Sequence, residues 1–188
     1  MADPEGMNIL LVFASTHGHT VRIAQRIAGV LRREGHHVSV RRIDEAPDRL
    51  DRWDAVVVGG SLHFADHQPE LVGWAHEHHR ELADRPNAFF SVSLSAAEGT
   101  PKARSAVREC IDRFVEDTEW DPDVSFPIAG CLQYLEYDPA TRVALRAKMH
   151  LHGKPSDTSR DHEMTDWAAV EQFAAGFAGR LGRTAVAA

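Results

Sequence analysis

The sequence predicts an α/β protein, built as an open parallel sheet with helices on both faces. Short apolar runs recur along the chain, and segments with one apolar helical face separate them. The length of 188 residues fits one domain that buries its own core. The expected strands are residues 8–13, 37–42, 55–59, 87–92 and 126–131, and the expected helices are residues 20–34, 69–84, 102–117 and 165–182.

The strands differ in how much of each is apolar. Residues 8–13 are an almost continuous apolar run, which is typical of a strand covered by helices on both faces. Residues 37–42 alternate valine with polar side chains and indicate a more exposed strand. Residues 55–59, Ala-Val-Val-Val-Gly, indicate a central strand, and the two later runs complete a sheet of five strands.

The helices are marked by periodicity and by their end signals. The first helix has one apolar face, made by Val21, Ala24, Ile27, Ala28 and Leu31. Thr20 is expected to be its N-cap, and Gly35 to end it. Pro69 begins the second helix, because proline suits a first helical turn. Asp166 and Trp167 open the last helix, where we expect the carboxylate to complement the helix dipole and the indole to pack.

Residues 132–163 do not fit a simple strand–helix connection, which usually has ~2–6 residues. Part of this stretch, residues 141–151, is predicted to be a short helix, and residues 153–159 have loop chemistry. Long loops in compact domains often carry function. We therefore expect a flexible tail at residues 1–6 and one domain at residues 7–188 with an insertion at 132–163.

The composition excludes several classes of function. With 21 Lys and Arg against 28 Asp and Glu, the net charge is −7, which disfavours nucleic acid as the main partner. Neither a signal peptide nor a run of ~20 apolar residues is apparent, and Cys110 and Cys131 make no disulfide framework. We therefore expect a cytoplasmic protein with a structural Cys131. No two of His76, His78 and His79 are four residues apart, so no metal site is expected.

The first candidate binding loop lies between the first strand and the first helix. It reads Ser15, Thr16, His17, Gly18, His19, Thr20, and it offers hydroxyl groups ahead of a helix N-terminus. Free backbone N–H groups and the helix dipole there suit a phosphate. The loop has no lysine and only one glycine, so it is neither a nucleoside-triphosphate loop nor a dinucleotide fingerprint. A plain capped turn is an equally open alternative.

Two further loops follow the third and fourth strands. Gly59 and Gly60 allow a flat ligand to approach the backbone closely. The next residues are Ser61, Leu62, His63 and Phe64, and the rings of the last two could flank that ligand. Ser93, Leu94, Ser95, Ala96 and Ala97 could bond the edge of a heterocycle. The alternatives are a glycine turn with Phe64 in the core, and a solvated loop. Together the three loops fit one ligand that has a phosphate and a planar ring.

The three loops resemble those of the flavodoxin-like family, which bind FMN after strands one, three and four. The phosphate loop of that family reads roughly [ST]-x-T-G-x-T, and residues 15–20 follow it except at His17. The resemblance implies a flavodoxin-like three-layer sandwich, with FMN as the cofactor. The hydroxyls of Ser15, Thr16 and Thr20 would then bind the phosphate, and residues 61–64 and 93–97 would hold the ring.

A closer resemblance is to the menaquinone-dependent protoporphyrinogen oxidases of haem biosynthesis. It is carried by residues 13–20, 58–64, 88–94, 120–123, 128–134 and 165–167, and by the insertion after the fifth strand. It implies oxidation of protoporphyrinogen IX with a quinone as acceptor, and at most peripheral contact with the cytoplasmic membrane. The quinone and the porphyrinogen are thus the expected partners; the oligomeric state stays open.

Site residues for the substrate follow from the same resemblance. Tyr134, Arg142 and Arg146 are the candidates, with the arginines holding propionate groups; an exposed helix face is the alternative. No catalytic acid or base is assigned, and His63 is the best candidate near the ring. The other functions left open are a flavodoxin-type electron carrier, an NAD(P)H:quinone reductase and a domain that has lost FMN.

Overall fold

The structure, a computed structural model, describes residues 6–15, 18–62, 65–132, 143–144, 146–147, 150–151, 157–159 and 161–187. Its centre is a five-stranded sheet in the order β2-β1-β3-β4-β5, and every strand pair is parallel. The strands are β1 (Asn8–Phe13), β2 (His37–Arg42), β3 (Ala55–Ser61), β4 (Asn87–Ser93) and β5 (Ser125–Ala129). This order and the parallel pairing confirm the predicted fold class.

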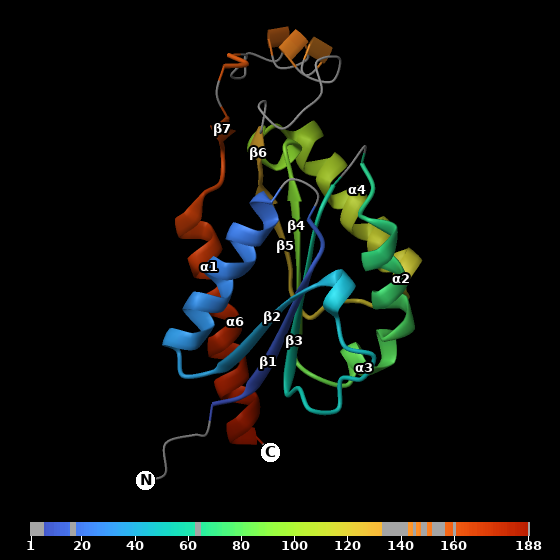
Figure 1. Cartoon of the computed structure of the whole chain (residues 1–188), viewed down its shortest axis with the longest axis vertical. Coiled ribbons are helices and arrows are strands. Elements are labelled where there is room, and N and C mark those ends of the chain that lie inside the picture. The colour runs from blue at the N-terminus through green and yellow to red at the C-terminus, as the bar shows by residue number, and fades with distance from the viewer. Residues whose placement is uncertain are drawn as a thin grey trace.

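Helices cover both faces of the sheet, as Figure 1 shows. One face carries α1 (His19–Arg33) and α6 (Trp167–Ala187). The other carries α2 (Pro69–Glu77), α3 (His79–Ala83) and α4 (Pro101–Thr118). The short 3-10 turns are η1 (Ile43–Glu45) and η2 (Ser95–Ala97). A separate antiparallel pair, β6 (Cys131–Leu132) with β7 (His162–Glu163), lies at the base of the insertion.

Two apolar cores result from the alternation of side chains along the strands. In β1, Ile9 and Leu11 face the α1/α6 layer, whereas Leu10 and Val12 face the α2/α4 layer, and all four are fully buried. The α2/α4 layer also contains an aromatic stack in which the ring centroids of Phe89 and Phe114 are 4.1 Å apart. Both cores hold the strand ends in place, which fixes the loops that leave them.

The ends of two helices differ from the prediction. Thr20 is not the N-cap of α1: that position is Gly18, with φ +80°, and Thr20 is the second residue of the helix and is buried. The predicted second helix is two helices, since His78 leaves helical geometry. The ring nitrogens of His78 lie 2.9 Å from the carbonyl oxygen of Trp74 and 3.2 Å from that of Asp48. The His78 N–H also donates to the Trp74 carbonyl at 3.1 Å, and α3 begins at the next residue.

Several other boundaries shift by a few residues. The predicted fifth strand ends at Ala129, and Gly130 leads into the separate strand β6. The last helix begins at Trp167, where the Asp166 carboxylate accepts from the Ala169 N–H (3.0 Å), and it continues beyond Gly182. Within the insertion, the few described residues of the predicted helix 141–151 are helical, and the others lie outside the described residues. No helix in the described part of the chain is long and apolar enough to cross a membrane.

Candidate functional site

The three predicted loops leave the sheet at one end. Strands β1, β3 and β4 run parallel, so their carboxyl ends open at the same edge. The N-terminus of α1 and the β6–β7 pair lie at this same end of the molecule (Figure 1). The fold therefore brings together the segments predicted to bind one ligand.

The first loop ends in a helix N-terminus that no side chain caps. The Ser15 hydroxyl accepts from the backbone N–H of Gly18 at 3.1 Å, which leaves its own O–H free to donate to a ligand. No acidic residue lies in the first turn of α1, so its N–H groups and dipole are available to an anion. Thr16 and His17 lie outside the described residues. The described part of the loop fits a phosphate.

His19 does not face this loop with its ring. Its side chain is only 6% exposed, and Nε2 lies 2.7 Å from the Thr165 hydroxyl oxygen. The Thr165 hydroxyl donates its proton to the Ala129 carbonyl at 2.7 Å, so it accepts from His19 Nε2–H. Burial lowers the pKa of His19 below 6.5, against the opposing attraction of Glu163. The ring is therefore neutral near pH 7, with its proton on Nε2.

The second loop is shaped by packing at its start. A Cβ built on Gly59 would lie 1.9 Å from the Phe90 ring, and one on Gly60 would lie 2.5 Å from Leu71. These glycines thus make room for the side chains of Phe90 and Leu71. The Ser61 hydroxyl accepts from Gln68 Nε2 at 2.8 Å.

Beyond Ser61, the second loop is tied to β4 and carries backbone strain. The Leu62 N–H donates to the Val92 carbonyl at 2.8 Å, which joins the ends of β3 and β4. His63 and Phe64 lie outside the described residues. Ala65 has φ +74°, a left-handed conformation that L-residues other than glycine seldom adopt. Ala65 is therefore a strained position where the loop leads toward α2.

Behind this loop lies a buried histidine that the sequence did not single out. His67 Nε2 is 2.9 Å from the Ser91 hydroxyl oxygen, and its ring packs edge-on against Phe89 and Phe114. Burial lowers the pKa of His67 to about 4, although Asp66 opposes the shift. The neutral ring of His67 therefore belongs to the aromatic cluster behind the loop.

The third loop is a compact turn. Ser93 is buried, and its hydroxyl accepts from the Ala96 N–H at 3.2 Å, while its carbonyl accepts from the Gly130 N–H at 3.0 Å. Residues 94–97 are half-buried; Leu94 precedes η2, which the next three residues form. Ser93 therefore shapes the turn that carries residues 94–97.

The predicted substrate residues are only partly described. Arg146 is exposed, whereas Tyr134 and Arg142 lie outside the described residues. Cys131 lies at the root of the insertion, where burial raises the pKa of its thiol to about 11. A thiol that keeps its proton at neutral pH is a poor nucleophile, which agrees with a structural role.

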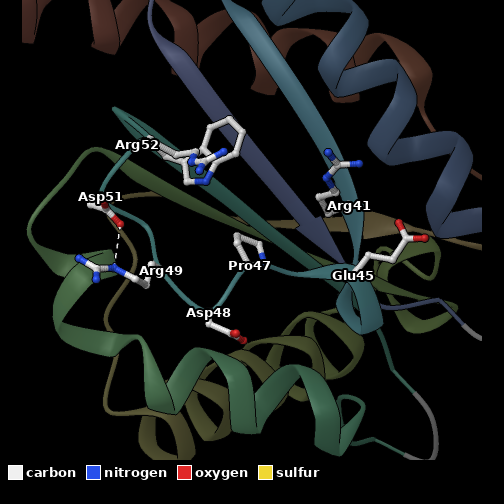
Figure 2. A pocket seen from close by; sticks show the side chains of 8 residues that line it. Arg41, Glu45, Pro47, Asp48, Arg49, Asp51 and Arg52 are labelled. Atoms are coloured by element: carbon white, nitrogen blue, oxygen red, sulfur yellow. Dashed lines mark hydrogen bonds and ion pairs between the residues drawn. The ribbon is translucent and has the colours of Figure 1, made fainter.

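A hollow elsewhere on the molecule does not coincide with these loops. Its volume is about 600 Å³, and it lies beside β2 and the segment leading to β3, as Figure 2 shows. It is lined by Arg41, Glu45, Pro47, Asp48, Arg49, Asp51, Arg52 and Trp53. Three arginines face three carboxylates, so the lining favours neither anions nor cations. None of the predicted site residues borders it.

The sheet order and the two helix layers define a flavodoxin-type protein. The chain belongs to the flavodoxin domain family, whose profile matches residues 10–159. This membership confirms the predicted fold family and agrees with the predicted FMN cofactor. Two curated relatives carry the same name, protoporphyrinogen IX dehydrogenase (quinone). The Escherichia coli K12 protein is 30% identical over 174 residues, with 89% of this chain and 93% of its own covered.

A further relative of that name is from Leishmania major, at 30% identity over 90% of this chain and 74% of its own. Solved structures share the fold. Oxidised flavodoxin 2 from Bacillus cereus has a TM-score of 0.58 at 16% identity, over 92% of this chain and 99% of its own. Rubredoxin oxygen:oxidoreductase from Desulfovibrio gigas has a TM-score of 0.57 at 14% identity. The match covers 98% of this chain but only 38% of that protein.

Proposed function

We propose that the chain is an FMN-dependent oxidoreductase that oxidises protoporphyrinogen IX and passes the electrons to a quinone. The observation that carries the proposal is the uncapped N-terminus of α1 at the edge where three loops meet. An anion-binding turn beside two loops at the carboxyl ends of β3 and β4 suits a ligand with a phosphate and a flat ring. The names of the relatives support the choice of substrate and acceptor.

The phosphate would bind at the first turn of α1. Backbone N–H groups at the start of the helix would donate to its oxygens, and the hydroxyls of Ser15 and Thr16 would add donors. Gly18 has φ +80°, which places the chain entering the helix in a conformation that a side chain would strain. The neutral His19 ring adds no positive charge, so the helix dipole and hydrogen bonds do the binding.

The ring would lie between the second and third loops. Residues 61–64 would contact one side and residues 94–97 the other, with Ser93 shaping the loop that carries them. The flavin supplies the redox chemistry when it is bound, and the protein orients it and tunes its potential. His67 and Cys131 are poor acid–base groups near pH 7, because burial lowers the pKa of His67 to about 4, which makes the ring a weak base, and raises the pKa of Cys131 to about 11, which makes the thiol a weak acid.

The porphyrinogen would bind against the insertion. Tyr134, Arg142 and Arg146 would contact it, with guanidinium groups paired to its propionates. We also propose a cytoplasmic location, with at most peripheral contact between this end of the molecule and the membrane that holds the quinone. The proposed domain is residues 7–188, with residues 132–163 as the substrate-binding insertion.

The first test is an absorbance spectrum of the purified protein with added FMN, followed by anaerobic protoporphyrinogen IX and then menaquinone. A flavin band that bleaches with the porphyrinogen and returns with the quinone is the expected result. A band that the porphyrinogen leaves unchanged would overturn the proposed substrate, and bleaching by NAD(P)H would then point to a reductase. A stable one-electron flavin signal would point to a carrier. A protein that binds no flavin would overturn the proposal itself.

A variant separates the insertion from the cofactor site. Arg146→Ala should raise the KM for protoporphyrinogen IX severalfold while FMN affinity stays within twofold, because Arg146 is exposed on the insertion. Arg108→Ala, on the exposed face of α4, is the matched control and should leave both quantities unchanged.

A further inference from the structure

A chain of two hydrogen bonds joins the first turn of α1 to the end of β5. His19 Nε2–H donates to the Thr165 hydroxyl at 2.7 Å, and that hydroxyl donates to the Ala129 carbonyl at 2.7 Å. A hydroxyl has one proton, so the second bond fixes the direction of the first. These three residues come from three elements that are far apart in the sequence.

The surroundings of His19 hold the ring in this arrangement. The His19 ring lies 6.0 Å from the Trp167 ring, centroid to centroid, in a tilted contact. Arg22 and Arg26 lie over the same indole, at 5.4 and 5.2 Å from its centroid. Arg22 also pairs with Glu163 at 3.3 Å. The start of α1 is therefore packed against the segment that returns from the insertion.

The position of His19 gives this contact a consequence for the anion site. His19 is the first residue of α1 and directly follows the uncapped Gly18, so its backbone belongs to the turn proposed to bind phosphate. Helix ends fray when side chains do not hold them. The bond from the His19 ring acts at the first residue of the helix, and together with the Trp167 contact and the Arg22–Glu163 ion pair it holds this turn near the sheet end.

We propose that Thr165 is a positioning residue for the phosphate of the cofactor. It holds the His19 ring by Nε2–H and so fixes the first N–H groups of α1 relative to the end of β5. This inference rests on the proposed FMN function and adds to it a residue from outside the three binding loops. The same contact couples the return strand of the insertion to the cofactor phosphate.

The test compares FMN with riboflavin, which has the same ring but lacks the phosphate. Thr165→Val keeps the branched shape and removes the hydroxyl. We expect a dissociation constant for FMN about tenfold higher, because the buried His19 Nε2–H loses its hydrogen-bond acceptor. Riboflavin affinity should stay within twofold. His19→Phe keeps a ring against Trp167 and removes the donor, and it should produce the same effect. The double variant should add nothing further.

Two controls isolate the hydroxyl at this position. Thr165→Ser keeps the donor and acceptor and should bind FMN as the wild type does. Thr118→Val removes another buried threonine hydroxyl, which donates to the Phe114 carbonyl at the same 2.7 Å in α4, and should leave the FMN-to-riboflavin ratio unchanged. Circular dichroism checks that each variant is folded. If Thr165→Val does not fold, His19→Phe tests the role of the His19–Thr165 bond in its place.

The outcomes are distinct. An unchanged FMN-to-riboflavin ratio in Thr165→Val and His19→Phe would overturn the role of Thr165 and leave the proposed function intact. Equal losses for FMN and riboflavin would also overturn it, because they would indicate a general loss of structure. A wild-type protein that binds neither flavin would overturn the proposed function itself.

Discussion

Acidification should destabilise this fold through His67. The unfolded chain binds a proton on this ring with the ordinary histidine pKa of 6.5, whereas burial lowers the pKa in the fold to about 4. Between these values the unfolded state holds more protons, so the free energy of unfolding must fall as pH falls. Linkage gives a loss of about 2 kcal/mol from pH 7 to pH 5, and about 3 kcal/mol by pH 4.

The assay is urea denaturation of the wild type and His67→Gln at pH 7 and pH 5. Glutamine stays neutral and keeps a group able to bond the Ser91 hydroxyl, so the variant should lose about 2 kcal/mol less than the wild type on acidification. The difference between the two proteins removes the contributions of other titrating groups. Equal losses would show that His67 is not held neutral by burial.

A graded control is available in His36. Burial also lowers its pKa, but His36 is only half-buried, and its Nδ1 accepts from the Met7 N–H at 3.3 Å. His36→Gln should therefore remove a smaller part of the pH dependence than His67→Gln does. The reverse order would refute burial as the cause of the pH dependence.

Three further changes test the packing around the site, each by chemical denaturation. Gly59→Ala should cost about 3 kcal/mol or more, because its Cβ would meet the buried Phe90 ring at 1.9 Å. Gly73→Ala in α2 is its control and should gain about 0.5–1 kcal/mol, since nothing lies within 4 Å; equal effects would contradict the packing argument. Ala65→Gly should gain about 1 kcal/mol by relieving φ +74°, and a loss would show that the turn is unstrained. Asp166→Ala should lose about 1 kcal/mol with its bond to the Ala169 N–H, whereas Asp166→Asn should lose less; the same loss in both would exclude a cap.

The sequence predicted the framework of the fold because local patterns determine it. The predicted strands at residues 8–13 and 37–42 match β1 and β2 residue for residue. Gly35 follows α1 with φ +93°, and Pro69 is the first residue of α2, as their backbone chemistry requires. The strand ends, and with them the three loops, could therefore be located from the sequence alone.

The sequence could not show which side chains meet across the fold. His19 and Thr165 are 146 positions apart, and no local pattern links them. The sequence suggested His19 as a phosphate contact, whereas its ring is bonded to Thr165. The contact of His78 with the carbonyl of Asp48, which is 30 residues away, could not be read from a local pattern either. The same is true of the packing of Gly59 against Phe90 and of Gly60 against Leu71, because these neighbours lie on other elements.

The pairing of β6 with β7 determines how the insertion is attached. Cys131 lies opposite Glu163 and Leu132 opposite His162, so the chain leaves and returns at adjacent points. A loop closed in this way can double in length for a further cost of only about 0.6 kcal/mol. Evolution, or a protein engineer, can therefore lengthen or exchange the segment between these strands without disturbing β5 or α6. The length of the insertion is thereby separated from the framework of the sheet, and the returning segment contacts α1 through the Arg22–Glu163 ion pair and the His19–Thr165 hydrogen bond.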